Sequence, residues 1–142
     1  MIIMKNQKQQ TGFTLIELLV VLVIIGLLAG LVGPRVLSQL GGAKSKTAVV
    51  QIKDIEQGLE LFKLDVGRFP SSEEGLAALQ SNSGNAPGWN GPYMKSGIPK
   101  DPWKKDYFYK YPSEGGGFDL YSYGADGVIG GSGEDADIHN LK

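Results

Sequence analysis

The sequence predicts an α+β fold in which one long N-terminal α-helix packs on a small antiparallel β-sheet. Three observations lead to this prediction. Residues 13–33 form a long apolar run, residues 49–66 repeat apolar side chains at spacings of three and four, and residues 106–124 contain two stretches that alternate in polarity. The first two patterns are typical of helices and the third is typical of strands.

The composition limits the chain to one small globular unit with an attached anchor. Its 142 residues, 42% of them hydrophobic, suffice for one core but hardly for two. The formal charge of −1 lacks the basic excess of nucleic-acid binders, so no nucleic-acid partner is expected. The absence of cysteine excludes disulfides, thiolate nucleophiles and cysteine-based zinc sites.

The apolar run "FTLIELLVVLVIIGLLAGLVG", residues 13–33, is long enough to cross a bilayer, which takes about 20 helical residues. A buried helix of a soluble protein and a secretory signal peptide are the alternatives. A signal peptide places its small-residue cleavage site after the run, whereas Gly12 precedes it here. Cleavage after Gly12 would remove a polar leader containing Lys5 and Lys8, and the run would remain as an anchor.

One acidic residue, Glu17, lies near the start of this anchor. An unpaired carboxylate inside a membrane costs on the order of a few kcal/mol. Glu17 either lies at the interface and reaches polar headgroups, or meets a cation inside an assembly. Cleavage after Gly12 would create such a cation, the ammonium of Phe13, on a neighbouring copy offset along the helix axis. The residues alone leave both interpretations open.

The stretch "TGFTLIELLVVLVIIGLLAGLVGP", residues 11–34, resembles the class III signal of type IV pilins and type II secretion pseudopilins. The resemblance implies that a prepilin peptidase cuts between Gly12 and Phe13 and that the new N-terminus on Phe13 is methylated. It also implies that Glu17 guides the docking of subunits into a helical filament. Pro34 matches the proline that commonly bends or melts the helix in such filaments.

Three further stretches resemble the major pseudopilin of the type II secretion system. They are "FPSSEEGLAAL" (69–79), "GPYMKSGIPKDPW" (91–103) and "DLYSYGADG" (119–127). A major type IV pilin, the alternative, typically closes its C-terminal region with a disulfide, which this chain cannot form. The divisions implied by the resemblance are a basic leader, 1–12, a transmembrane and assembly helix, 13–34, and a periplasmic domain, 35–142.

After Pro34 the helical pattern resumes as an amphipathic helix. Its apolar positions are Val49, Ile52, Ile55, Leu59, Phe62 and Val66. Its solvated face carries Lys53, Asp54, Glu56, Glu60 and Lys63. Gly41 and Gly42 mark an expected weak point. A turn and a second short helix should follow at 67–79, because Ser71 or Ser72 can cap amides, while Glu73 and Glu74 suit the positive end of a helix.

Aromatic residues crowd the segment from 87 to 112. They are Trp89, Tyr93, Trp103, Tyr107, Phe108, Tyr109 and Tyr111. A groove for carbohydrate or peptide is one interpretation, but aromatic side chains in short strands usually pack on a helix. "DYFYKY" (106–111) and "FDLYSYG" (118–124) are the predicted strands.

The stretch "GADGVIGGSGEDADI", residues 124–138, collects four acidic residues, Asp126, Glu134, Asp135 and Asp137, among glycines. A solvated acidic loop and a calcium site are the two interpretations, since calcium takes six to eight oxygen ligands in flexible geometry. The acids do not follow the EF-hand spacing, and "GGSGEDADI" would be only one copy of a calcium-binding nonapeptide that works in tandem.

Major pseudopilins have a calcium-binding β-loop at this place, so the resemblance implies a Ca²⁺ cofactor. The implied ligands are the carbonyl oxygens of Tyr123 and Val128 and the side chains of Asp126, Asp135 and Asp137. Ala136 separates the last two acids, and this spacing differs slightly from the family's. The choice among the later acids, Glu134 included, therefore stays open.

An enzymatic function finds little support in the sequence. Ser132, Asp137 and His139 form the one conceivable acid–base cluster, and they have no nucleophile-elbow context. No phosphate-binding loop or metal-protease helix is present either. The chain is expected to be a substrate of processing enzymes and not a catalyst.

Taken together, the resemblance implies a membrane-anchored major pseudopilin that polymerises into a periplasmic fibre and drives the export of folded proteins. The implied location is the bacterial inner membrane, with a cytoplasmic N-terminus and a periplasmic C-terminal domain. The implied partners are copies of itself, minor pseudopilins, the prepilin peptidase and N-methyltransferase, the inner-membrane assembly platform and membrane lipid. The alternatives are a type IV pilin for adhesion or motility, and a membrane-tethered calcium-binding ectodomain.

Overall fold

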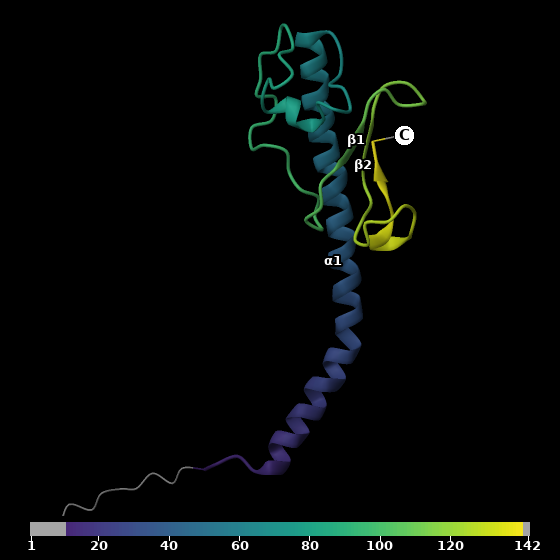
Figure 1. Ribbon diagram of the computed structural model, residues 1–142. Helices are drawn as coiled ribbons and strands as arrows, with labels where there is room; N and C mark the ends of the chain where they lie inside the picture. Colours follow the sequence, from purple (N-terminus) through teal and green to yellow (C-terminus); the bar gives the residue numbers. More distant parts are fainter. Residues whose placement is uncertain (1–10, 141–142) are drawn as a thin grey trace, which may run out of the picture. The chain divides into compact units, whose positions relative to one another are not determined.

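The computed structural model describes residues 11–140 (Figure 1). Its elements, in chain order, are α1 (Leu15–Val66), the 3₁₀ helix η1 (Leu76–Leu79), β1 (Phe108–Lys110), β2 (Asp119–Ser122), the 3₁₀ helix η2 (Gly133–Asp135) and β3 (Ile138–His139). The chain divides into two compact units, Met1–Ser38 and Gln39–Lys142. One long helix and one small antiparallel sheet confirm the predicted α+β fold.

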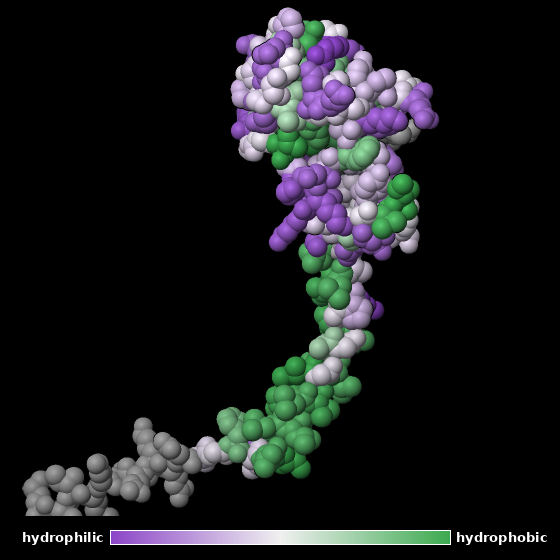
Figure 2. Space-filling view, in the orientation of Figure 1, coloured by the Kyte–Doolittle hydropathy of each residue, from purple (hydrophilic) through white to green (hydrophobic). Residues whose placement is uncertain are grey.

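In the first unit, helix α1 has no apolar partner among residues 11–140. All residues from 11 to 32 are exposed. The most apolar 18-residue window of α1 has a mean hydropathy of 3.0, and none of it is buried, so α1 is long and apolar enough to cross a membrane. Figure 2 shows this part as an almost unbroken hydrophobic surface. The chain therefore does not bury this segment in a core of its own.

Helix α1 continues through the three positions where the sequence suggested an interruption. Pro34 lies inside the helix, and Gly41 and Gly42 are helical as well. Proline removes one backbone donor and crowds the preceding turn, whereas glycine only lowers the helix propensity. The helix is therefore not interrupted at Pro34 or Gly41 in this conformation of the single chain.

In the second unit, one face of α1 forms one side of the core. The buried positions are Ala48, Ile52, Ile55, Leu59 and Phe62, at spacings of four, three, four and three. The prediction was wrong for Val49, which is 42% exposed. Because consecutive helical residues are about 100° apart, the stripe that contains Ile52 runs through Ala48 and leaves Val49 at its edge. Val66 packs against the core and is partly buried.

The sheet has the strand order β1-β2-β3, and both pairings are antiparallel. Phe108 pairs with Tyr121, and Tyr121 pairs in turn with His139. Leu120 and Ser122 on β2 are buried, so this strand points alternate side chains inward, as its sequence pattern predicts. Strand β3 was not predicted, because its two residues, at the end of the acidic stretch and just after it, are too few to show an alternating pattern.

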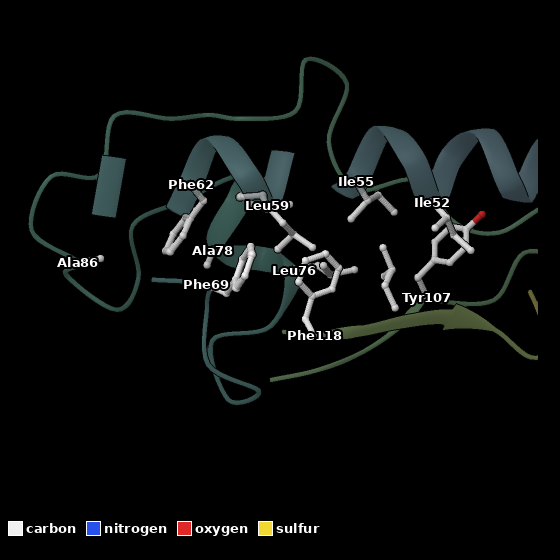
Figure 3. Close-up of a cluster of buried hydrophobic side chains, with 12 residues drawn as sticks. Ile52, Ile55, Leu59, Phe62, Phe69, Leu76, Ala78, Ala86, Tyr107 and Phe118 are labelled. Atoms are coloured by element: carbon white, nitrogen blue, oxygen red, sulfur yellow. The ribbon is translucent and has the colours of Figure 1, made fainter. Parts of the chain in front are cut away.

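The core lies between α1 and the segments that follow it. Figure 3 shows Ile55, Leu59 and Phe62 of the helix directed toward Phe69, Leu76 and Phe118. The ring of Phe69 meets Phe118 edge to face, with the centroids 4.8 Å apart.

The aromatic-rich segment contributes mostly to this core. Tyr107 is buried, Tyr93 lies edge to face on Phe62, and the indole N–H of Trp89 donates to the Ala78 carbonyl over 2.8 Å. Phe108 is an exception and is exposed. These contacts favour packing over a binding groove as the role of the aromatic residues.

The second predicted helix is shorter than expected. Residues 72–75 form turns, and only Leu76–Leu79 are helical, as a 3₁₀ helix. Gly75 has a φ of 60°, which no α-helix accepts, and so prevents an α-helix across this segment. Ser71 does accept from the Glu74 amide through its Oγ, and the Ser71 amide donates to Glu74 Oε2 over 2.7 Å. These bonds close the turn before the helix, whereas η1 itself begins after Gly75 and has no side-chain cap. Arg68 also binds the Glu74 carboxylate through both terminal nitrogens.

Candidate functional site

The predicted cleavage site lies just before helix α1. Gly12 and Phe13 are both exposed and precede Leu15, the first helical residue. A peptidase can reach such an exposed peptide bond outside regular secondary structure. Most of the predicted leader, including Lys5 and Lys8, lies outside the described residues.

Glu17 belongs to a capping box at the start of α1. The Thr14 amide donates to Glu17 Oε2 over 2.8 Å, and the Glu17 amide donates to Thr14 Oγ1 over 3.3 Å. The Thr14 hydroxyl also donates to the same carboxylate oxygen over 3.0 Å. Sequence reasoning missed this role, although threonine followed three residues later by glutamate is the capping-box signature.

This cap leaves the charge of Glu17 without a counter-ion. Hydrogen bonds from Thr14 lower the cost of placing the carboxylate in apolar surroundings, but they do not neutralise it. Within residues 11–140, no basic side chain lies within ion-pair distance of Glu17. The capping box thus holds the Glu17 carboxylate in a fixed position, where it could accept from the predicted ammonium on another copy.

The second candidate site is the stretch 123–138, called the acidic loop below. Its two sides approach closely, because the Ala125 amide donates to the Glu134 carbonyl over 2.8 Å. A Cβ atom on Gly124 would lie 2.7 Å from the same carbonyl oxygen, so only glycine fits there. Gly124 also has a φ of 69°, which favours glycine independently.

Two of the predicted calcium ligands bind amides of this loop. Asp126 Oδ1 accepts from the Val128 amide over 3.0 Å, and Asp137 Oδ2 accepts from the Gly130 amide over 2.9 Å. The other oxygen of Asp137 is buried and has no hydrogen-bond partner. Asp135 is exposed. Among residues 11–140, no group of three or more acidic, histidine or cysteine side chains is close enough to hold one metal ion.

Glu134 points to a different place from the other acids. A Cβ atom on Gly41 of α1 would collide with the Glu134 carboxyl group. The side chain of Glu134 thus packs against the helix where Gly41 opens room for it. This contact favours Asp135 and Asp137 over Glu134 among the later acids.

The donor chemistry of the acidic loop fits calcium. A buried carboxylate oxygen without a partner normally indicates a missing ligand or an unfavourable charge. Calcium binds backbone carbonyl oxygens as well as carboxylates, and among the described residues the three carboxylates of the predicted set are not gathered into one cluster. The predicted set, which combines the carbonyls of Tyr123 and Val128 with acidic side chains, is of this kind.

Lys105 already brings one positive charge to the acidic loop. Its ammonium donates to the Ala125 carbonyl over 2.7 Å and lies 3.4 Å from the Gly124 carbonyl. Sequence reasoning missed this residue, because nothing in the local pattern around 105 indicates a contact 20 residues away.

A buried carboxylate, Asp101, holds the base of the acidic loop. Asp101 is only 4% exposed. Its Oδ1 accepts from the amides of Trp103 and Lys105 over 3.0 and 2.8 Å, and its Oδ2 accepts from the Ser122 hydroxyl over 2.7 Å. Ser122 Oγ accepts in turn from the Gly124 amide over 3.2 Å. One side chain thereby joins the 101–105 turn, the end of β2 and the first residues of the loop.

The conceivable acid–base cluster is not assembled as a triad. His139 Nε2 lies 3.9 Å from Asp137 Oδ2, and the imidazole ring stacks on Tyr121 with the centroids 5.1 Å apart. Ser132 is exposed, and no hydrogen bond within the described part of the chain joins it to His139. Burial and the hydrogen bond with Tyr123 raise the pKa of Tyr121 to about 12, so this phenol stays neutral. No activated nucleophile results from this arrangement.

Comparison with known proteins covers both candidate sites. Residues 35–141 match the family described as type II secretion system (T2SS), protein G, and residues 7–33 match the prokaryotic N-terminal methylation motif. A type II secretion system core protein G of Pseudomonas aeruginosa is 47% identical over 138 residues, with 95% of this chain and 97% of that protein covered. The protein of the same name from Vibrio cholerae is 43% identical, with 96% and 95% covered.

The structure is similar to that of a solved relative. The crystal structure of the major pseudopilin from the type 2 secretion system of enterohaemorrhagic Escherichia coli aligns with a TM-score of 0.61 and 30% identity. The alignment covers 73% of this chain and 91% of that one.

Proposed function

The chain belongs to the type II secretion system protein G family, and from this premise we propose how its parts serve that system. It is the major structural subunit of the pseudopilus, the fibre that drives the export of folded proteins across the outer membrane. The observation that carries this conclusion is the match along nearly the whole chain, from the methylation motif to the sheet domain. No relative reported above is a type IV pilin for adhesion or motility.

We propose that a prepilin peptidase cuts the chain between Gly12 and Phe13 and that the new N-terminus on Phe13 is methylated. The methylation motif at 7–33 supports this step, as does the exposure of both residues before the helix starts. The processed chain then begins with an apolar helix and no polar leader. It can therefore leave the bilayer and enter an apolar fibre core without carrying a charged extension.

Glu17 then guides assembly. The capping box holds its carboxylate at the beginning of α1, where a new ammonium on Phe13 of a neighbouring copy can neutralise it. Like-charge contacts between unpaired carboxylates would disfavour other offsets along the axis. An axial offset that leaves Glu17 unpaired thus has a higher free energy than the offset that pairs it with Phe13. The ion pair between Glu17 and the Phe13 ammonium therefore selects the register of the fibre. Pro34, inside α1, is the point where the helix would bend or melt when the copies pack.

The proposed location is the bacterial inner membrane, with the N-terminus in the cytoplasm and the sheet domain in the periplasm. The exposed apolar part of α1 supports a single membrane span. The proposed partners are other copies of the chain, minor pseudopilins, the prepilin peptidase and N-methyltransferase, the inner-membrane assembly platform and membrane lipid.

Calcium is the proposed cofactor of the acidic loop. The carbonyls of Tyr123 and Val128 and the carboxylates of Asp126, Asp135 and Asp137 would hold it. The buried, unpartnered oxygen of Asp137 supports this set, and so does the oxygen-only donor chemistry. When bound, the ion supplies positive charge that removes the repulsion among the carboxylates and orders the loop.

We also propose that the chain catalyses no reaction. Members of this family are structural subunits, and Ser132, Asp137 and His139 do not form an aligned triad. If the purified chain hydrolysed esters or peptides, and His139→Ala abolished the turnover, this proposal would be wrong.

The proposed processing and function can be tested together in the native bacterium. We expect mass spectrometry to find a methylated Phe13 at the N-terminus of the mature chain. We also expect deletion of the gene to abolish protein export, and Glu17→Leu not to restore it. An intact Met1, a cut after residue 33 or normal export without the chain would contradict the proposal.

Calcium binding is tested separately, with the full-length chain in detergent. At calcium concentrations of about 100 Kd, a ligand that binds only the folded state adds about 2.7 kcal/mol to the free energy of unfolding. We expect a chelator to lower the melting temperature of the unaltered chain, and Asp137→Asn to remove that difference. Glu134→Gln is the matched control and should retain it. Equal melting temperatures with and without chelator would exclude a stabilising metal.

A further inference from the structure

The outer side of the acidic loop exposes two apolar residues, Val128 and Ile129, called the apolar tip below. Val128 is 61% exposed and Ile129 is 79% exposed. Figure 2 shows a small hydrophobic patch over this loop, surrounded by polar surface. Single exposed apolar residues need no explanation, whereas contiguous exposed apolar surface rimmed by polar residues can mark a contact surface, so this adjacent pair is a candidate for one.

The apolar tip is held in place by the loop's own hydrogen bonds. Asp126 accepts from the Val128 amide, and Asp137 accepts from the Gly130 amide, so the backbone is anchored on both sides of Ile129. A pre-ordered loop loses little conformational entropy when it binds. The tip therefore has the properties of a ready-made docking element.

A second exposed apolar surface lies on α1, at Leu61 and Leu64, called the leucine shelf below. Leu61 is 50% exposed and Leu64 is 79% exposed. With Gln57 and Glu60 they line a shallow recess of about 510 Å³. Its apolar floor and polar edge are typical of a surface that receives an aliphatic side chain.

The tip and the shelf lie at opposite ends of the second unit. Glu134, in the same loop as the tip, packs against α1 at Gly41. Leu61 follows 20 residues later, which corresponds to about 30 Å along a helix. In Figure 1 the acidic loop lies beside the earlier turns of this unit's helix, and the last turns of α1 lie at the far end.

This arrangement suits end-to-end stacking of identical domains. A contact between two different surfaces of the same chain is heterologous, and it extends into a helical filament when the rotation does not close a ring. A fibre built from one subunit needs such a pair of unlike surfaces on each copy. The apolar tip and the leucine shelf meet this requirement within one domain.

We propose that the apolar tip of one copy docks on the leucine shelf of a second copy farther along the fibre. The proposal rests on the proposed function, because it assumes that this chain polymerises. In this proposal the acidic loop contacts the next copy directly. An ordered loop would then stabilise the contact between copies as well as the single domain.

The absence of cysteine in this chain permits a direct test. Full-length chain with Ile129→Cys and Leu64→Cys is expressed in cells with the intact secretion system and then oxidised. We expect a ladder of disulfide-linked multimers, because each copy contributes both halves of the contact. Each single variant should give no ladder. The matched control combines Ile129→Cys with Val50→Cys, since Val50 is an exposed residue of the same helix.

Fibres that form without a ladder, or an equal ladder with Val50→Cys, would overturn the contact and leave the proposed function intact. If the unaltered chain formed no fibres, the proposed function would fail and the contact with it.

If the double cysteine variant does not assemble, a second test replaces the two contact residues by a pair of opposite charges. Leu64→Glu should lower apparent assembly affinity about ten- to a hundred-fold, as expected for the loss of one buried aliphatic contact. Adding Ile129→Lys should restore assembly, because the new ammonium meets the new carboxylate. A double variant no better than Leu64→Glu alone would refute the contact.

Discussion

Replacement of Asp101 by alanine should destabilise the sheet domain severely. The substitution removes the acceptor for three hydrogen bonds, from the amides of Trp103 and Lys105 and from the hydroxyl of Ser122. Hydrogen bonds to charged groups contribute about 1.5 to 3 kcal/mol each. Water can reach part of the 101–105 turn, so the sum is reduced. We expect a loss of about 3 to 5 kcal/mol in the free energy of unfolding.

The free energy of unfolding is measured by urea denaturation of the full-length chain in detergent, with near-ultraviolet circular dichroism as the signal. Asp101→Asn retains one carbonyl oxygen for the two amides and loses the acceptor for Ser122, so it should cost about 1 to 2 kcal/mol. Asp106→Ala is the matched control, because Asp106 is exposed and its pair with Lys100 is worth less than about 1 kcal/mol. The reasoning is refuted if Asp101→Ala costs no more than the control.

Two further substitutions test single interactions. Glu17→Gln keeps an acceptor for Thr14 but removes the negative charge. If the charge guides assembly, this variant should form no fibres in electron micrographs, and the same is expected of Glu17→Leu. A normal yield of fibres from Glu17→Gln would assign Glu17 to helix capping alone. Hydrogen bonds from Arg68 and the Ser71 amide lower the pKa of Glu74 from 4.5 to about 2, so its stabilisation is complete above pH 4.5 and is lost as the pH falls toward 2. Between pH 6 and pH 3 the unaltered chain should lose about 1 kcal/mol more than Glu74→Gln in urea titrations, and parallel losses would show that this partly exposed pair contributes nothing.

The long helix and two of the three strands could be predicted because their signals are local. The spacing of Ile52, Ile55 and Leu59 defines one helix face, and alternation along 118–124 defines a strand. The prediction was wrong at two positions, where a shift of one residue around the helix or a single backbone angle decides the local structure. Val49 lies just outside the buried stripe, and the positive φ of Gly75 limits the second helix to one 3₁₀ turn.

The residue types of the candidate sites could be read from the sequence, but the contacts that hold these sites together could not. Acids among glycines allowed either a solvated loop or a calcium site, and the assembly role of Glu17 was implied by the family resemblance; both stay predictions. The contacts that hold the loop join distant parts of the chain: Lys105 reaches Ala125, and Asp101 reaches Ser122. Such pairs leave no periodic trace in a single sequence, because any lysine or aspartate in a turn looks the same before folding.

The unburied first half of α1 also constrains how a fibre can grow. Transfer of so many aliphatic side chains into water would cost about 1.5 to 3 kcal/mol for each one. A free subunit dissolved in water is therefore not a workable supply for the fibre. Subunits that join a fibre should instead come directly from lipid, and the rate of elongation should follow their surface density in the bilayer. Shortening should likewise return them to that two-dimensional pool.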